Sequence, residues 1–123
     1  MVLSITSFKV LFWLIAGHAI MDFWAQSDSV AKMKNRHNDP AKFCPPGQKP
    51  QAMWFYALSA HAVMHGAMVM VVTQSLTFGL GETVLHWLID FGKCENWYGI
   101  HFDQFLHIWL KIMYWLIIIG FRL

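Results

Sequence analysis

Charged side chains are scarce in this chain of 123 residues: Asp, Glu, Lys and Arg together make up only 13% of it. Soluble domains carry roughly 25% of these residues. The hydrophobic fraction is 57%, with 10 Phe, 8 Met and 7 Trp, and a soluble domain this small cannot bury so much apolar surface. The composition therefore excludes an ordinary soluble domain and predicts an integral membrane protein surrounded by membrane lipids.

Nucleic-acid binding, a disulfide framework and a cleavable leader are not indicated either. The formal net charge is only +2, and no basic stretch is interleaved with aromatic residues, so we expect no nucleic-acid partner. The two cysteines, Cys44 and Cys94, lie in polar connections that we place in the cytoplasm, where free thiols are expected. No basic cluster precedes the first apolar segment and no clear small-residue cleavage site follows it, so we expect no signal peptide.

Four apolar segments run through the chain, at about residues 5–24, 53–72, 78–92 and 100–121. A helix needs about 20 residues to cross the hydrocarbon core of a bilayer. The third segment is short, which leaves open whether it is tilted, begins near Leu76 or enters the bilayer without crossing it. We predict an all-α fold, with residues 1–123 forming a single domain that is a four-helix transmembrane bundle.

One long polar loop, residues 27–51, separates the first two segments. It carries five basic residues against two acidic ones, together with all four prolines of the chain. The positive-inside rule places this loop in the cytoplasm, so we predict a multi-pass protein of the bacterial inner membrane. We interpret Lys32, Lys34 and Arg36 as topology determinants that contact anionic lipids. Lys111 is expected to extend toward the cytoplasmic surface, and Glu82 to lie at the opposite interface.

Polar pairs with a spacing of four residues interrupt all four apolar segments. Residues i and i+4 of a helix point in nearly the same direction, so each pair occupies one face. Two of the pairs lie in near-repeats, His18–Phe23 and His86–Phe91, which suggests two hairpins of similar pattern. The predicted topology puts all four pairs in the cytoplasmic half of the bilayer. The pairs are His18 with Asp22, His61 with His65, His86 with Asp90, and Asp103 with His107.

The chemistry of these residues favours a metal centre. Charge in hydrocarbon is costly unless compensated, so the carboxylates should face inward toward the imidazoles. The set exceeds the four ligands of one zinc ion and would serve one or two divalent transition metals, with zinc favoured and manganese or iron as alternatives. We predict metal ligands among His18, Asp22, His61, His65, His86, Asp90, Asp103 and His107. We assign Asp22, Asp90 and Lys93 to catalysis, and Gln26, Gln104 and His101 to orienting ligands or contacting substrate.

Three functions remain open from these residues. The first is metal-assisted hydrolysis of a phosphate ester or a lipid-linked substrate. The second is conduction of protons or ions along the same side chains, for which Glu82 would extend the path. The third is a phage-encoded membrane interaction protein (an exclusion, lysis-accessory or virion-membrane component) in which the polar residues only hold the helices together. A homodimer is a further expectation about partners.

The motifs also resemble a known family. His18-x-x-x-Asp22-Phe23-x-x-Gln26, with Ala31-x-x-Lys34 after it, resembles small multi-span membrane proteins of bacteria and phages whose function is unknown. Its middle histidines match His61-x-x-x-His65, and its later blocks match His86-x-x-x-Asp90-x-x-Lys93 and Asp103-Gln104-x-x-His107. A more distant resemblance is to bacterial membrane-bound metal-dependent hydrolases, although this chain lacks their Pro-Asp-x-Asp segment. The first resemblance implies a multi-span membrane protein, and the second implies metal-dependent hydrolysis.

Overall fold

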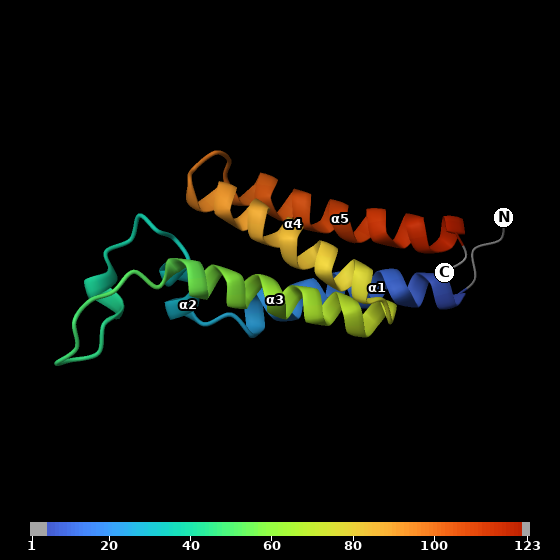
Figure 1. Ribbon diagram of the computed structural model, residues 1–123. Helices are drawn as coiled ribbons and strands as arrows, with labels where there is room; N and C mark the ends of the chain where they lie inside the picture. Colours follow the sequence, from blue (N-terminus) through green and yellow to red (C-terminus); the bar gives the residue numbers. More distant parts are fainter. Residues whose placement is uncertain (1–4, 122–123) are drawn as a thin grey trace.

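The fold is all-helical, as predicted. The computed structural model describes residues 5–121, and every regular element in that range is a helix. Four long helices lie along one another, and the polar loop gathers at one end of the bundle (Figure 1). In chain order the elements are α1 (Ile5–Ala19), a π-helical turn (Ile20–Trp24), α2 (Asp28–Met33), a 3-10 turn (Pro40–Phe43), α3 (Trp54–Thr73), α4 (Leu76–Cys94) and α5 (Ile100–Phe121).

Three stretches within residues 5–121 are long and apolar enough to cross a membrane: Ile5–Trp24, Trp54–Thr73 and Ile100–Phe121. The prediction of four spanning helices is therefore wrong in number. The predicted third span, 78–92, lies within α4, where Glu82, Asp90 and Lys93 lower the hydropathy. In Ile5–Trp24 and in Ile100–Phe121, only 17% of the most apolar 18-residue stretch is buried inside the bundle. The apolar side chains of α1 and α5 therefore face outward, as they would toward lipid.

α3 and α4 form a tight hairpin. Gln74 ends α3 in the left-handed conformation (φ 56°), and Ser75 caps α4 by accepting a hydrogen bond from the Phe78 amide. Gly66 and Gly79 then let the two backbones approach closely, because a Cβ on Gly66 would lie 2.6 Å from the Gly79 carbonyl oxygen. This close approach brings the polar faces of α3 and α4 together.

The bundle interior is divided into an apolar and a polar part. Leu14, Val69 and Tyr114 form a buried apolar cluster, and each lies four to seven residues farther from the loop end of its helix than His18, His65 or His107 does. The half nearer the loop is filled with imidazole and carboxylate side chains. An interior of this kind is the reverse of a soluble bundle, because the apolar side chains lie mostly outside and the charged ones inside.

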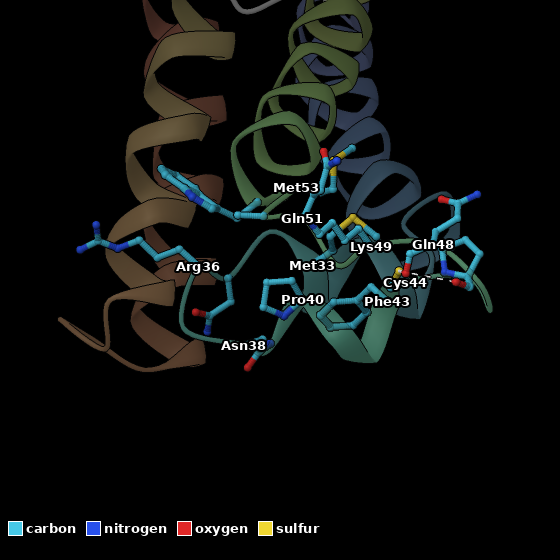
Figure 2. A pocket seen from close by; sticks show the side chains of 14 residues that line it. Met33, Arg36, Asn38, Pro40, Phe43, Cys44, Gln48, Lys49, Gln51 and Met53 are labelled. Carbon is cyan, nitrogen blue, oxygen red and sulfur yellow. Dashed lines mark hydrogen bonds between the residues drawn. The ribbon is translucent and has the colours of Figure 1, made fainter.

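Ion pairs hold the polar loop against the end of α4. Arg36 donates two hydrogen bonds to Glu95, from Nε (2.6 Å) and Nη2 (3.0 Å), and His37 Nε2 lies 3.1 Å from the same carboxylate. A cavity of about 520 Å³ lies between the loop and the first turn of α3 (Figure 2). Met33, Asn35 and Trp54 are among the residues that line it. The loop thus covers the polar end of the bundle without filling it.

Candidate metal centre

A π-helical turn positions Asp22. The Ala25 amide donates to the Ile20 carbonyl at 2.7 Å, five residues back, which inserts one residue into the helical turn. Such turns occur mostly as single insertions and often at functional sites. Gln26 Nε2 donates to the Asp22 carbonyl (3.2 Å), while the Asp22 carboxylate points into the bundle and remains only 8% exposed.

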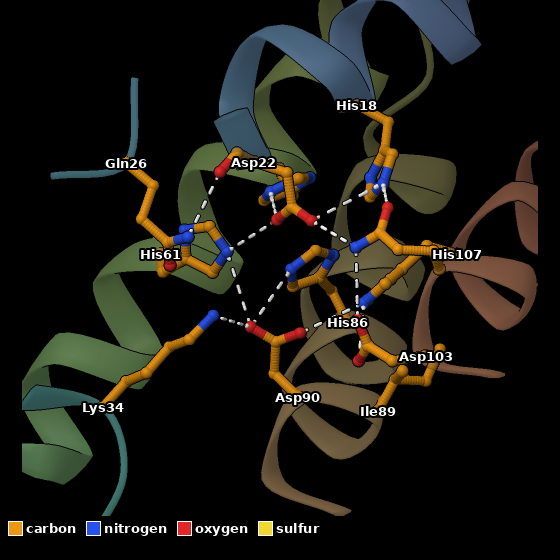
Figure 3. Close-up of polar contacts among 12 residues, drawn as sticks. His18, Asp22, Gln26, Lys34, His61, His86, Ile89, Asp90, Asp103 and His107 are labelled. Carbon is orange, nitrogen blue, oxygen red and sulfur yellow. Dashed lines mark hydrogen bonds and ion pairs between the residues drawn. The ribbon is translucent and has the colours of Figure 1, made fainter. Parts of the chain in front are cut away.

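Asp22 meets three histidines from α3 and α4, and we call this set the four-ligand cluster: Asp22, His61, His65 and His86 (Figure 3). Each residue offers one ligand atom, and the four atoms all lie within 4.8 Å of one another. The Nε2 atoms of His61 and His65 lie 3.1 Å and 3.2 Å from Asp22 Oδ1. The residues present could therefore hold a metal ion.

Two ring nitrogens of the four-ligand cluster have no hydrogen-bond partner. His65 Nε2 and His86 Nε2 are both buried and unpaired among the described residues. His65 Nε2 lies near Asp22 Oδ1, but the angle does not allow a hydrogen bond. A buried polar nitrogen without a partner is costly, and a metal ion would satisfy both.

Glu82 fixes the orientation of His86. Glu82 Oε1 lies 3.3 Å from His86 Nδ1, and since a carboxylate only accepts, this nitrogen carries the proton and Nε2 carries the lone pair. Carboxylates commonly orient metal-binding histidines in this way. Lys111 Nζ and the Tyr114 hydroxyl (2.9 Å) both donate to Glu82.

Two sequence-based interpretations are wrong here. Glu82 is fully buried in the bundle rather than placed at an interface, and Lys111 is 1% exposed rather than extended to the surface. Glu82 lies seven residues after the N-cap Ser75, and Lys111 lies eleven residues after the start of α5 at Ile100, so in the sequence each is an isolated charge in an apolar segment. The spacing Glu82, His86, Asp90, which places all three on one face of α4, was the available signal.

A second set of residues lies beside the first, and we call it the Asp90 cluster: Asp90, Asp103 and His107. His107 Nε2 donates to Asp90 Oδ1 at 3.0 Å and lies 3.5 Å from Asp103 Oδ1. Lys34 Nζ donates to Asp90 Oδ2 at 2.5 Å. The interpretation of Lys34 as a lipid contact is therefore wrong, because its side chain is buried in the bundle.

His18 and Gln104 connect the two clusters. His18 Nε2 donates to Gln104 Oε1 (3.0 Å), and Gln104 Nε2 donates to Asp22 Oδ2 (2.8 Å) and to Asp103 Oδ2 (3.2 Å). The rings of His86 and His107 are stacked with centroids 4.2 Å apart. His18, His86 and His107 form a third group whose ring nitrogens could share an ion.

The buried charges do not balance. Within residues 5–121, four carboxylates lie inside the bundle (Asp22, Glu82, Asp90 and Asp103), and they face two ammonium groups, Lys34 and Lys111. With the histidines neutral, the interior lacks two positive charges. Uncompensated charge is costly away from water, so either one divalent cation or two protons on histidines would be needed for balance.

The structure brings together all eight residues predicted as metal ligands, with Gln26 and Gln104 beside them. It does not bring Lys93 or His101 to them. Lys93 is half-buried in the last turn of α4, and no hydrogen bond or ion pair within residues 5–121 joins it to either cluster. His101 is exposed in the first turn of α5. Whether the assembled residues bind metal or catalyse a reaction stays a prediction.

Two pKa shifts characterise the link that closes this end of the bundle. The hydrogen bonds from Arg36 hold the pKa of the Glu95 carboxyl below its usual value. Burial raises the pKa of the Tyr98 hydroxyl to about 12, and this hydroxyl donates to the Ile89 carbonyl. Glu95 therefore stays ionised, and Tyr98 stays protonated, over the physiological range.

Comparison with known proteins gives one match. The model of the family described as "Protein of unknown function (DUF3307)" matches residues 10–122. No curated protein and no solved structure matches the chain.

Proposed function

This chain belongs to the DUF3307 family of proteins of unknown function, and we propose that it is a membrane-embedded protein that binds one divalent transition metal ion at the four-ligand cluster. The observation that carries the proposal is the pair of buried, unpartnered Nε2 atoms of His65 and His86 beside the Asp22 carboxylate. The interior charge agrees with this proposal and with a single ion per chain. One divalent cation supplies the two positive charges that the buried side chains lack.

Zinc is the metal that the donor set favours. Ligand atoms at about 2.0–2.1 Å from a tetrahedral zinc ion lie about 3.3 Å from one another. The separations of 3.1 Å and 3.2 Å between Asp22 Oδ1 and the Nε2 atoms of His61 and His65 agree with that spacing. Three imidazoles and one carboxylate also suit iron, manganese and cobalt, whereas calcium and magnesium prefer all-oxygen sites.

Metal analysis of protein purified in mild detergent tests the proposal. We expect about one transition metal ion per chain in the unmodified protein, and loss of that ion in His65→Ala and His86→Ala, because each change removes one of four ligands. The matched control is His101→Ala, which removes an exposed histidine and should leave the metal content unchanged. Metal-free protein after gentle purification, or equal metal loss in all three variants, would refute the proposal.

Hydrolysis of a phosphate ester or lipid-linked substrate stays a second proposal, in which water would either add to the four protein ligands as a fifth or displace one of them. Asp90 supports it, because Asp90 Oδ2 lies 3.4 Å from His61 Nε2 and could accept a proton from such a water whenever the Lys34 ammonium, which binds the same oxygen, withdraws. The metal-loaded protein should then cleave a chromogenic phosphate ester, and Asp90→Asn should abolish the cleavage without removing the metal. Cleavage that persists in Asp90→Asn would count against this role.

Conduction of protons or ions is the rival that the polar stripe of α4 supports. Glu82, His86 and Asp90 span about 12 Å along the helix, at 1.5 Å per residue. Flux through liposomes that requires Asp90 but no bound metal would favour conduction over the metal centre. We also propose that the protein lies in the inner membrane with the loop in the cytoplasm, because the loop carries five of the nine Lys and Arg residues.

A further inference from the structure

We propose that the Asp90 cluster is a second cation site, through which metal enters the bundle from the loop side, and that the Lys34 ammonium occupies this site until metal displaces it. The inference rests on the proposed metal centre, because it assigns the route by which that centre is filled. Beyond that centre, we infer a second metal-binding site and an internal cation, the Lys34 ammonium, that competes with metal for it.

The Asp90 cluster has the donor atoms of a cation site. Asp90, Asp103 and His107 are at most 2% exposed, and each offers one atom within 4.8 Å of the other two. Asp103 Oδ1 is buried without a hydrogen-bond partner, and it lies 3.5 Å from His107 Nε2. Two carboxylates and one imidazole suit a first-row divalent ion.

A cation already occupies the edge of this site. Lys34 Nζ lies 2.5 Å from Asp90 Oδ2, and Figure 3 shows the Lys34 side chain reaching Asp90 from the side opposite His107, which binds the other carboxylate oxygen, Oδ1. A lysine ammonium is one mobile charge on a long flexible stem. A divalent ion at the same carboxylate makes stronger interactions and can therefore replace it.

The segment that carries Lys34 has room to withdraw. Lys34 follows α2, a helix of six residues, and its neighbours Met33 and Asn35 line the cavity of about 520 Å³ under the loop. The polar contacts of this segment with α4 and its C-cap are the Lys34–Asp90 pair and the contacts of Arg36 and His37 with Glu95, and only the first of these is buried. Release of Lys34 from Asp90 would therefore connect the cavity with the Asp90 cluster.

An ion at the Asp90 cluster is close to its final ligands. Asp90 Oδ2 lies 3.4 Å from His61 Nε2 and 3.7 Å from His86 Nε2, so Asp90 borders both clusters. Once the ion has moved to the four-ligand cluster, Lys34 can return to Asp90. The interior is then balanced, with one divalent ion and two ammonium groups facing four carboxylates.

The test is the rate at which Co²⁺ enters metal-free, full-length protein in nanodiscs, followed by the visible absorption of tetrahedral Co²⁺. Lys34→Ala should speed entry by about tenfold, the factor expected when one charge-assisted hydrogen bond to a buried carboxylate is lost. Asp103→Asn should slow entry by about tenfold, because one donor of the first site is lost. Lys32→Ala is the matched control, since it removes an exposed lysine two residues away. Co²⁺ should enter Lys34→Arg as slowly as it enters the unmodified protein, because the positive charge is kept.

The outcomes separate the two proposals. If unmodified protein gives no tetrahedral Co²⁺ spectrum, the metal centre itself is wrong. If that spectrum forms in the unmodified protein and is lost in Asp22→Asn, the metal centre stands. The entry site is then wrong if Co²⁺ enters Lys34→Ala and Asp103→Asn as fast as it enters Lys32→Ala. Circular dichroism checks that Lys34→Ala is folded, and if it is not, the rate for Asp103→Asn decides alone.

Discussion

Replacing Lys111 by Met removes the ammonium that pairs with Glu82 while keeping a side chain of similar length and volume. Lys111 is 1% exposed and Glu82 is fully buried, so water cannot replace the lost partner. Breaking a buried ion pair by removing one member costs about 3–5 kcal/mol of stability. We expect a loss near the lower end, about 3 kcal/mol, because Tyr114 and His86 still donate to Glu82.

Metal binding should respond in the opposite direction. Without Lys111 the interior lacks three positive charges, so Lys111→Met should bind Zn²⁺ more tightly than the unmodified protein. The double variant Lys111→Met with Glu82→Gln loses both charges and should regain most of the stability, since replacing a whole buried ion pair is often nearly neutral. Its metal affinity should nevertheless fall by about 10–100-fold, because His86 loses the carboxylate that orients it.

The free energy of unfolding is measured by titrating micelle-embedded protein with sodium dodecyl sulfate, and the Zn²⁺ affinity by competition with a chelator. Lys9→Met is the control, because Lys9 is exposed on α1. A loss below about 1 kcal/mol for Lys111→Met, the range of exposed ion pairs, would mean that the ammonium reaches the surface. The count of interior charges, and with it the argument for a single divalent ion, would then be refuted.

Three further predictions concern packing, pH and metal removal. Gly66→Ala should destabilise the fold by about 1–3 kcal/mol, because the new Cβ would lie 1.9 Å from Thr83 Oγ1. Gly81→Ala is the control and should not destabilise the fold, because the space around Gly81 is open. The same titration with sodium dodecyl sulfate compares the two variants. Arg36 lowers the pKa of Glu95, so their ion pair stabilises the loop fully at pH values above the usual carboxyl pKa, and this stabilisation is lost as the pH falls through the lowered pKa of Glu95. A nitroxide spin label at residue 38 should therefore become mobile only at that acidic pH. In Glu95→Gln, which lacks the carboxylate, the label should be mobile at every pH. Removing the metal with a chelator should lower the free energy of unfolding by about 2.7 kcal/mol, compared with protein in free metal at 100 times the dissociation constant. A free energy of unfolding that chelation leaves unchanged would contradict a bound ion.

The sequence predicts the helices better than the number that span. Runs of about 20 apolar residues locate three helical stretches within one residue of their observed ends, because the hydrocarbon thickness sets the length that is needed. These are α1 together with the π-helical turn (Ile5–Trp24), α3 and α5. α4 fails as a span because three charged side chains share its apolar length. The α4 helix packs closely on α3 at Gly66 and Gly79, and the hydropathy of a single segment does not report such packing.

The site is predictable in part for a similar reason. Spacing of four residues fixes which side chains share a helix face, so the pairing of His61 with His65 needs no knowledge of the fold. The contacts between helices depend on how the helices are rotated. The π-helical turn at Asp22, the reach of Lys34 to Asp90 and the pairing of Lys111 with Glu82 all follow from that packing, and the sequence gives no spacing rule for them.

Zinc K-edge X-ray absorption of the purified protein tests the central claim most directly. A metal held by Asp22, His61, His65 and His86 predicts four nitrogen or oxygen neighbours at about 2.0–2.1 Å, with the outer-shell signal of imidazole rings, at about one zinc per chain. A protein that retains no transition metal, or zinc with six oxygen neighbours and no imidazole signal, would contradict the account.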